Sequence, residues 1–216
     1  MSTALTQADL DALAAACREA EAKTGAEVVV YAVRRCDPYA ESRWRVAALV
    51  AVAAVLGVAL ARFGHPGWHG ADALLLWSVP SLVAGFLAGW LIGGWGPVVR
   101  RLASEEIDRI VELRAAAAFV EEEVFDTRDR TGVLLFVALF EHRFVVLADA
   151  GIRKRVAEGV WDEIVHDTVH GFREGRGREA LQAAVRRVGD LLADAGVPRR
   201  EDDVNELADA PRIRDV

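Results

Sequence analysis

Residues 131–151 read TGVLLFVALFEHRFVVLADAG, and this stretch decides the fold because it holds the clearest β pattern in a largely helical sequence. Two apolar runs, 133–140 and 144–148, are rich in β-branched and aromatic residues and flank the polar residues 141–143. This pattern is typical of a strand, a turn and a second strand. The first run is apolar at every position, so we expect both faces of this strand to be covered.

A second β pattern lies near the start of the chain, where residues 27–33 read EVVVYAV. It is apolar on both sides, which predicts a strand in the interior of a sheet. Before it, Thr6 followed by Asp9 predicts the capped start of a helix that ends at Gly25. Further helices are expected from Ser104 to about residue 125, after Gly151, and after Gly177.

Composition indicates that part of the chain lies in lipid, because 53% of the residues are hydrophobic. The formal charge of -7 argues against a nucleic-acid partner, since phosphate binding needs a basic surface. Cys17 lies on the apolar side of a predicted helix and Cys36 in an arginine-rich linker, so we expect reduced thiols. The first 45 residues lack the apolar run of a signal peptide, so targeting is expected from internal segments.

Two uncharged stretches predict a transmembrane hairpin over residues 44–99, with spans at about 46–63 and 74–98. The first uncharged run, 46–61, would be about 24 Å long as a helix, and the second, 73–99, about 40 Å. Five of the six tryptophans lie in or beside this region, and four of them are near the predicted membrane surfaces, as an aromatic belt requires. The lipid bilayer is therefore the first predicted partner.

Arginine distribution predicts the orientation of the hairpin. The connection between the spans has only Arg62. The arginines before and after the spans are Arg34, Arg35, Arg43, Arg45, Arg100, Arg101, Arg109 and Arg114. Positive residues stay on the cytoplasmic side, so we expect a multi-pass protein of the plasma (inner) membrane with both termini in the cytoplasm.

Glycines recur every fourth residue in the second span, at Gly85, Gly89 and Gly93, and therefore share one helical face. One interpretation is a homo-oligomer that forms through this face. The other, which we favour, is that the glycines pack the two helices of the hairpin together. The small residues that could face them are Ala47, Ala51 and Ala54.

Several short motifs occur in a characteristic order: TGAEVVV at 24–30, RTGVLL at 130–135, Arg143, and ADAGI at 148–152. In this order they resemble the TPM domain, named after thylakoid-lumen, photosystem II repair and levamisole-receptor auxiliary proteins. The resemblance implies an α/β fold, with a small central sheet of three or four strands and helices on both faces. We expect a bacterial, membrane-anchored member of this family.

The domain organisation follows from this resemblance. Residues 1–35 and 101–198 would form one discontinuous TPM-like domain, interrupted by the inserted transmembrane hairpin. Residues 199–216 are polar and have too few apolar side chains to pack, so we expect a disordered tail.

Candidate site residues lie where the predicted strands and loops meet. Plant members of the family are associated with acid phosphatase activity and with calcium, and here the acidic residues are Asp126, Asp129 and Asp149. Asp149 at the end of a central strand could be catalytic, or could hold calcium or magnesium together with the other two. The alternative, which we favour, is that Asp149 caps the next helix. Arg128 and Arg130 would oppose a cation and favour a salt-bridged loop.

A second motif places His166 and His170 four residues apart, with Asp167 between them. This spacing is typical of a zinc metalloprotease helix, although no third ligand is evident and Asp is shorter than the usual Glu. A histidine pair on a solvated helix face is the interpretation that we favour.

Three functions follow from these observations. The first is an interaction or assembly module at the cytoplasmic membrane face, with other membrane proteins as partners. The alternative is a divalent-metal-dependent phosphatase or hydrolase that uses Asp149. The most remote is the zinc metalloprotease.

Overall fold

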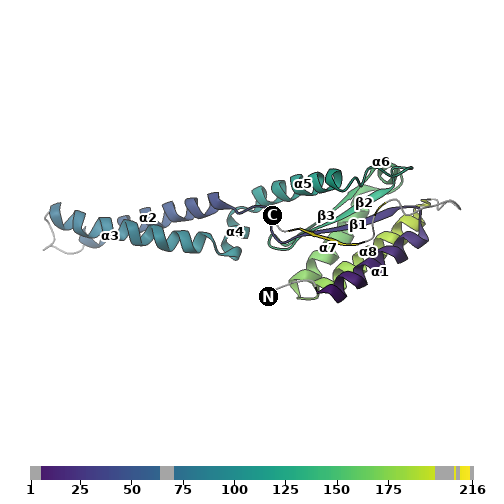
Figure 1. Cartoon of the computed structure of the whole chain (residues 1–216). Coiled ribbons are helices and arrows are strands. Elements are labelled where there is room, and N and C mark those ends of the chain that lie inside the picture. Colours follow the sequence, from purple (N-terminus) through teal and green to yellow (C-terminus); the bar gives the residue numbers. More distant parts are fainter. Residues whose placement is uncertain (1–5, 64–70, 198–206, 208–209, 215–216) are drawn as a thin grey trace. The chain divides into compact units, whose positions relative to one another are not determined.

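The computed structural model describes residues 6–63, 71–197, 207 and 210–214 (Figure 1). Its contacts divide the chain into two compact units: Met1–Cys36 together with Asp108–Val216, and Asp37–Ile107. The boundary after Ile107 falls inside helix α5 (Ser104–Glu121). The second unit is thus inserted in the sequence of the first.

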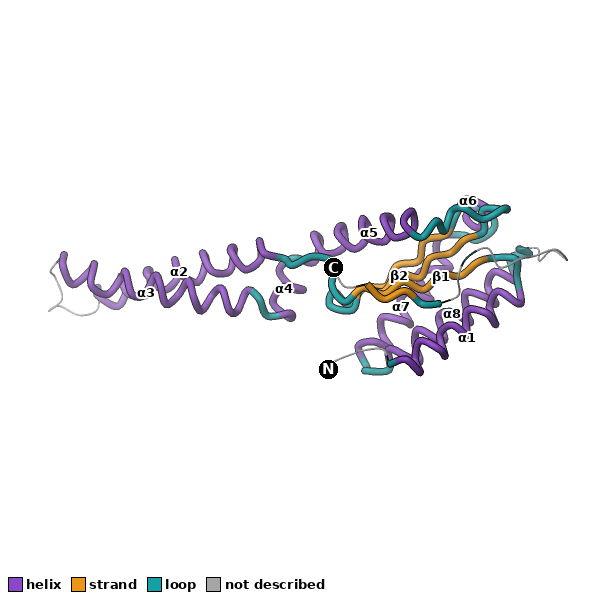
Figure 2. The backbone as a smooth tube through the Cα atoms, viewed as in Figure 1, coloured by secondary structure: helices purple, strands orange, loops and turns teal. Residues whose placement is uncertain are grey.

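The first unit contains a four-stranded sheet in the order β3-β2-β1-β4 (Figure 2). Its strands are β1 (Glu27–Val33), β2 (Gly132–Ala138), β3 (Arg143–Ala148) and β4 (Arg212–Arg214). β2 and β3 form the antiparallel hairpin predicted from the sequence, and β1 pairs in parallel with β2. β1 is an interior strand, as its apolar pattern predicts.

Helices cover both faces of this sheet, which confirms the predicted fold class. The helices of the unit besides α5 are α1 (Gln7–Lys23), α6 (Ala150–Arg153), α7 (Glu158–Arg173) and α8 (Gly177–Asp194). Figure 1 shows α1, α7 and α8 on one face of the sheet and α5 on the other. α1 begins with the predicted capping box, in which Thr6 and Asp9 bond to each other's backbone N–H groups.

Each face of β1 packs against different partners. Val28, Val30 and Ala32 belong to the core that β1 and β2 share with α1, α7 and α8. On the opposite face Tyr31 stacks on Phe136, with ring centroids 5.7 Å apart, and Arg114 of α5 lies 3.4 Å from the Tyr31 hydroxyl. β1 and β2 are therefore buried along their whole length, as strands apolar on both faces should be.

The expected disordered tail is wrong for residues 212–214, because they form β4. Tyr31 pairs with Arg212 in parallel register, and the N–H of Arg34 donates to the carbonyl of Arg214 at 3.4 Å. Arg212 and Arg214 also form ion pairs with Glu122. Backbone pairing with the open edge of β1 does not need apolar side chains, which is why composition missed it. Residues 199–206, 208–209 and 215–216 of the expected tail lie outside the described residues.

The helix expected after Gly151 forms in two parts, α6 and α7, with a turn between them. Ile152 and Val156 are buried around this turn, and Ile164 is buried in α7. Val160 is 39% exposed, because α7 turns Ile164 and Trp161 toward the core.

The second unit contains α2 (Ala40–Phe63), α3 (Ala71–Gly93) and α4 (Gly96–Leu102). α2 and α3 form the inserted apolar hairpin. α2 begins before the expected residue 46, and its 24 residues give it a length of about 36 Å. α3 ends at Gly93 rather than near residue 98, and Pro97 lies at the start of α4. Proline lacks the N–H that would continue the first helix, whereas it is well suited to the start of the second.

The glycine row of α3 packs against α2, which is the interpretation favoured from the sequence. A Cβ atom on Gly89 would lie 2.6 Å from the Cα of Ala47, and one on Gly85 would lie 2.9 Å from the Cβ of Ala54. The same atom on Gly93 would lie 2.8 Å from the Cα of Arg43. These distances leave no room for a side chain, so this face is already occupied by α2 within the chain.

The large apolar side chains of the hairpin point outward. Those that are between 44% and 75% exposed include Leu49, Val52, Leu56, Leu60, Leu76, Trp77, Leu87, Leu91 and Ile92. Ala40–Ala61 and Leu76–Gly93 are long and apolar enough to cross a membrane, and only 17% of the most apolar window in each is buried. The structure therefore supports membrane association through this unit.

Candidate functional site

Asp149 follows β3 and caps the short helix α6. Its Oδ1 accepts a hydrogen bond from the N–H of Ala150 at 2.6 Å. The guanidinium of Arg130 also contacts Asp149. Its Nη2 donates a hydrogen bond to Oδ1 at 3.1 Å. Its Nε forms an ion pair with Oδ2 at 2.7 Å, without a hydrogen bond. The Asp149 side chain is 4% exposed. A buried carboxylate thus has a cation and a backbone donor as its partners.

The location of Asp149 corrects one expectation. β3 is an edge strand of the described sheet, whereas we expected Asp149 to end a central strand. Because β3 runs antiparallel to β2, Ala148 pairs with Val133, beside the amino-terminal ends of β1 and β2. Open α/β sheets bind ligands at the carboxyl ends of their parallel strands. Asp149 lies at the other end of these strands.

The loop 126–130 reaches Asp149 through Arg130 and through its backbone. The N–H of Gly151 donates to the carbonyl of Arg130 at 2.9 Å, and a Cβ on Gly151 would lie 2.5 Å from the carbonyl oxygen of Asp129. The side chains of Asp126 and Asp129 are exposed. The salt-bridged loop that the arginines favoured is present, with Arg130 as the partner of Asp149.

The three aspartates do not form a recognisable ligand set. Within the described ranges, no group of three or more His, Cys, Asp or Glu residues is arranged to hold a metal ion. The calcium or magnesium site at Asp126, Asp129 and Asp149 stays a prediction. The cap and the Arg130 ion pair are sufficient to explain why a carboxylate is buried at position 149.

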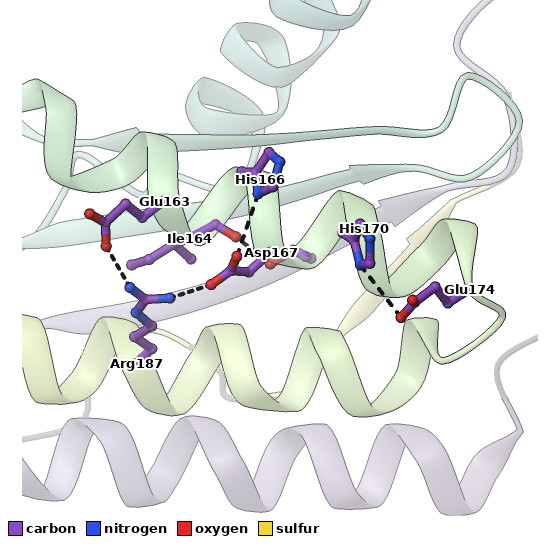
Figure 3. A network of polar contacts seen from close by, with 8 residues as sticks. Glu163, Ile164, His166, Asp167, His170, Glu174 and Arg187 are labelled. Carbon is purple, nitrogen blue, oxygen red and sulfur yellow. Dashed lines mark hydrogen bonds and ion pairs between the residues drawn. The ribbon is translucent and has the colours of Figure 1, made fainter.

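The two histidines lie on one face of α7, as their spacing predicts, with ring centroids 6.3 Å apart (Figure 3). Both are exposed. Nδ1 of His166 lies 3.5 Å from Asp167, and Nδ1 of His170 lies 3.4 Å from Glu174. The part of the chain that the structure describes supplies no third ligand to this pair.

Asp167, which occupies the position of a zincin general base, is bound instead to α8. Arg187 donates from Nη1 to Asp167 at 2.6 Å and from Nη2 to Glu163 at 2.7 Å, so its guanidinium lies between two acids of α7 (Figure 3). The hydrogen bond from Arg187, assisted by His166, holds the pKa of Asp167 below its usual range. A carboxylate whose pKa is lowered in this way is a poor proton acceptor. We therefore interpret the contacts of Arg187 as a link between α7 and α8 and not as the activation of a general base.

A solvent-open groove of about 440 Å³ lies between α7 and α8, next to this network. Its small residues include Gly171, Ala180 and Ala183, and its charged residues include Arg176 and Glu179. A Cβ on Gly171 would lie 2.4 Å from the Cβ of Ala180, so the helices approach closely at one end.

The groove residues named above include no activated nucleophile. The hydroxyl of Thr168, which also lines it, donates to the carbonyl of Ile164 at 2.6 Å. Sequence analysis missed both the groove and Arg187, because the partners of Arg187 lie on another helix and no local spacing marks it.

Comparison with known proteins agrees with the geometry. The family model of the TPM domain matches residues 98–191. The fold is similar to the NMR structure of the BA42 protein from the psychrophilic bacterium Bizionia argentinensis, with a TM-score of 0.60 and 18% sequence identity. That similarity covers 99% of this chain and 98% of the other. No curated protein matches the sequence. Residues 98–191 therefore match the TPM domain, and they include the hairpin of β2 and β3 and the helices around it.

Proposed function

We propose that this protein is a membrane-anchored interaction or assembly module. In this proposal α2 and α3 cross the plasma (inner) membrane, both termini lie in the cytoplasm, and the TPM domain binds other membrane proteins at the cytoplasmic face. Calcium- or magnesium-dependent hydrolysis at Asp149 is the competing function, and it is tested below by substitution of that residue.

The observation that carries the proposal is the outward-facing apolar surface of the hairpin. Exposing such side chains to water costs about 25 cal/mol for each Å² of apolar surface, and monomeric soluble proteins rarely expose large contiguous patches. Only 17% of the most apolar window in each span is buried, whereas the core helix of a soluble protein is mostly buried. A bilayer would cover this surface.

The dimensions of the hairpin support a complete crossing. α2 and α3 have 24 and 23 residues, which correspond to about 36 and 34 Å of helix. Both values exceed the roughly 30 Å of a hydrocarbon core. α2 begins at Ala40, after the folded strand β1, which is not where a cleaved signal sequence would lie.

The interaction role is supported by the α7–α8 face. It combines an open groove, small side chains, and the Arg187 network with charges of both signs. These features suit recognition of a polar protein surface better than bond cleavage, because every charged member of the network is paired.

Cysteine labelling of intact cells tests anchoring and orientation together. A cysteine placed at Gly67, in the connection between the spans, should react with a membrane-impermeant maleimide, and one placed at Ser2 should not; both positions lie outside the described residues. The native thiols, Cys17 and Cys36, are buried and give little background.

Membrane fractionation and permeabilised cells provide the controls. The cysteine at Ser2 should become reactive once the membrane is permeabilised. External labelling at Ser2 would reverse the orientation, and recovery of the chain outside the membrane fraction would contradict anchoring.

A further inference from the structure

We propose that Arg43 binds the phosphate of an anionic phospholipid. The site lies where the chain enters α2 and leaves α3, at the end of the hairpin where Arg43 packs on Gly93. The inference rests on the proposed membrane anchoring, and it adds a specific lipid class as a ligand.

Within the described part of the chain, the side chain of Arg43 has no acidic partner. Among the described residues no carboxylate forms an ion pair with it, and its Nε is buried without a hydrogen-bond acceptor. Its neighbour Arg45 provides a contrast, because Arg45 lies 2.9 Å from Glu41 and 3.9 Å from Glu106. A guanidinium with unused donors in a partly buried place needs an anion from elsewhere.

Aromatic and glycine residues hold the guanidinium of Arg43 in place. Its central carbon lies 5.9 Å from the ring centroid of Trp90, within cation–π distance, and Trp44 packs edge-on against Trp90 at 4.8 Å. A Cβ on Gly94 would lie 2.8 Å from Nε and 3.0 Å from Nη2 of Arg43. Glycine at position 94 therefore provides the space that the guanidinium occupies.

The surroundings match the depth of a lipid headgroup. Trp44, which contacts Trp90, is exposed, as is Trp95 just after α3, and tryptophan prefers the membrane–water interface, where the phosphates lie. The positive end of the α2 dipole also lies close by, since Arg43 is in the first turn of α2. The acid of that turn, Glu41, is paired with Arg45, and because residues two positions apart do not face each other on a helix, it does not neutralise Arg43.

The chemistry favours a headgroup with net negative charge. The planar guanidinium fork can donate two parallel hydrogen bonds to one phosphate. In a zwitterionic headgroup the lipid's own ammonium competes for that phosphate. Phosphatidylglycerol is therefore a suitable probe, and phosphatidylcholine with the same acyl chains is its neutral reference.

Native mass spectrometry of the detergent-purified full chain, given equal amounts of the two lipids, tests the proposal. Wild type should retain phosphatidylglycerol about fivefold over phosphatidylcholine. Arg43→Gln should bring this ratio close to one. Arg45→Gln removes the same charge two residues further along α2 and should leave the ratio unchanged, because Arg45 already has acidic partners.

A second pair of variants keeps every charge. Gly94→Ala should weaken the preference, because its methyl group displaces the guanidinium of Arg43 from the position that it occupies. Gly57→Ala is its control, since nothing lies within 4 Å of a Cβ at position 57. Helical circular dichroism equal to that of wild type shows that each variant remains folded.

The possible outcomes separate this inference from the anchoring on which it rests. Flotation with phosphatidylcholine vesicles tests anchoring alone. If wild type floats but shows no headgroup preference, or if Arg43→Gln keeps the preference, the lipid site is wrong and anchoring stands. Equal losses in Arg43→Gln and Arg45→Gln would indicate a general charge effect and overturn the assignment. Displacement of phosphatidylglycerol by inorganic phosphate would also overturn it in favour of a soluble anion.

Discussion

The two units of this protein place their apolar side chains in opposite ways. In the sheet unit, β1 and β2 are buried along their whole length. In the hairpin unit, Gly85, Gly89 and Gly93 lie at the contact between the helices, while leucine, valine and tryptophan side chains are exposed. This difference is expected if water surrounds the sheet unit and lipid surrounds the hairpin unit. In water, removal of apolar surface drives packing, whereas in lipid it does not, and helices associate through close contact of small residues.

The largest expected effect comes from a charge on the exposed surface of each unit. Val52→Arg places a charge within the first span, at a site 55% exposed, and should cost about 3 kcal/mol of insertion free energy. Leu113→Arg, on α5 at a site 60% exposed, should change stability by no more than about 0.5 kcal/mol because water solvates the new charge.

The inserted fraction of Val52→Arg and the thermal unfolding of Leu113→Arg measure these two effects. Equal, small effects at both sites would show that the two surfaces face the same solvent. The contrast between the units would then disappear, and with it the main argument for membrane anchoring.

A smaller effect is expected from glycines at helix contacts, which both units use. A Cβ on Gly89 would lie 2.6 Å from the Cα of Ala47, and one on Gly189 of α8 would lie 2.6 Å from the Cβ of Ala20 in α1. Gly89→Ala and Gly189→Ala should each destabilise their own unit by about 1–3 kcal/mol through overpacking. Gly57→Ala should be neutral or slightly stabilising, because that position is open.

Thermal unfolding of the full chain in detergent, followed by tryptophan fluorescence and circular dichroism, measures these losses. A Gly89→Ala variant as stable as Gly57→Ala would mean that the helices can separate at no cost. The close packing described for the hairpin would then contribute nothing to its stability.

The smallest expected effect concerns Asp149, where a cap and a metal ligand make different demands. As a cap, Asp149→Ala should cost about 1 kcal/mol and Asp149→Asn less, since asparagine also accepts the bond from Ala150. As a metal ligand, the charge itself is needed, so both variants should lose any stabilisation by calcium or magnesium. We expect the cap result and no ion-dependent shift.

The melting temperatures of wild type and both variants, each with calcium, with magnesium and with chelator, distinguish these cases. A wild-type shift with either ion that both variants lose would favour the hydrolase function. It would also require Arg130 to move away from the carboxylate that it now contacts.

Local patterns in the sequence were sufficient for much of the fold. The apolar run at 27–33 predicted β1 with the bounds that the structure shows, and Thr6 with Asp9 predicted the capping box of α1. The glycine spacing in α3 predicted one packed face. Each of these signals depends on residues a few positions apart, so the sequence displays them directly.

The tertiary structure alone decided what depends on distant partners. β4 forms because the edge of β1 is open, and Arg187 pairs with Glu163 and Asp167 because α7 and α8 lie side by side. Arg130 contacts Asp149 only because the edge strand β3 pairs with β2. Charge pairing and edge pairing act through space rather than along the chain. Residue type and spacing therefore showed where charges occur, and only the fold determined which of them meet.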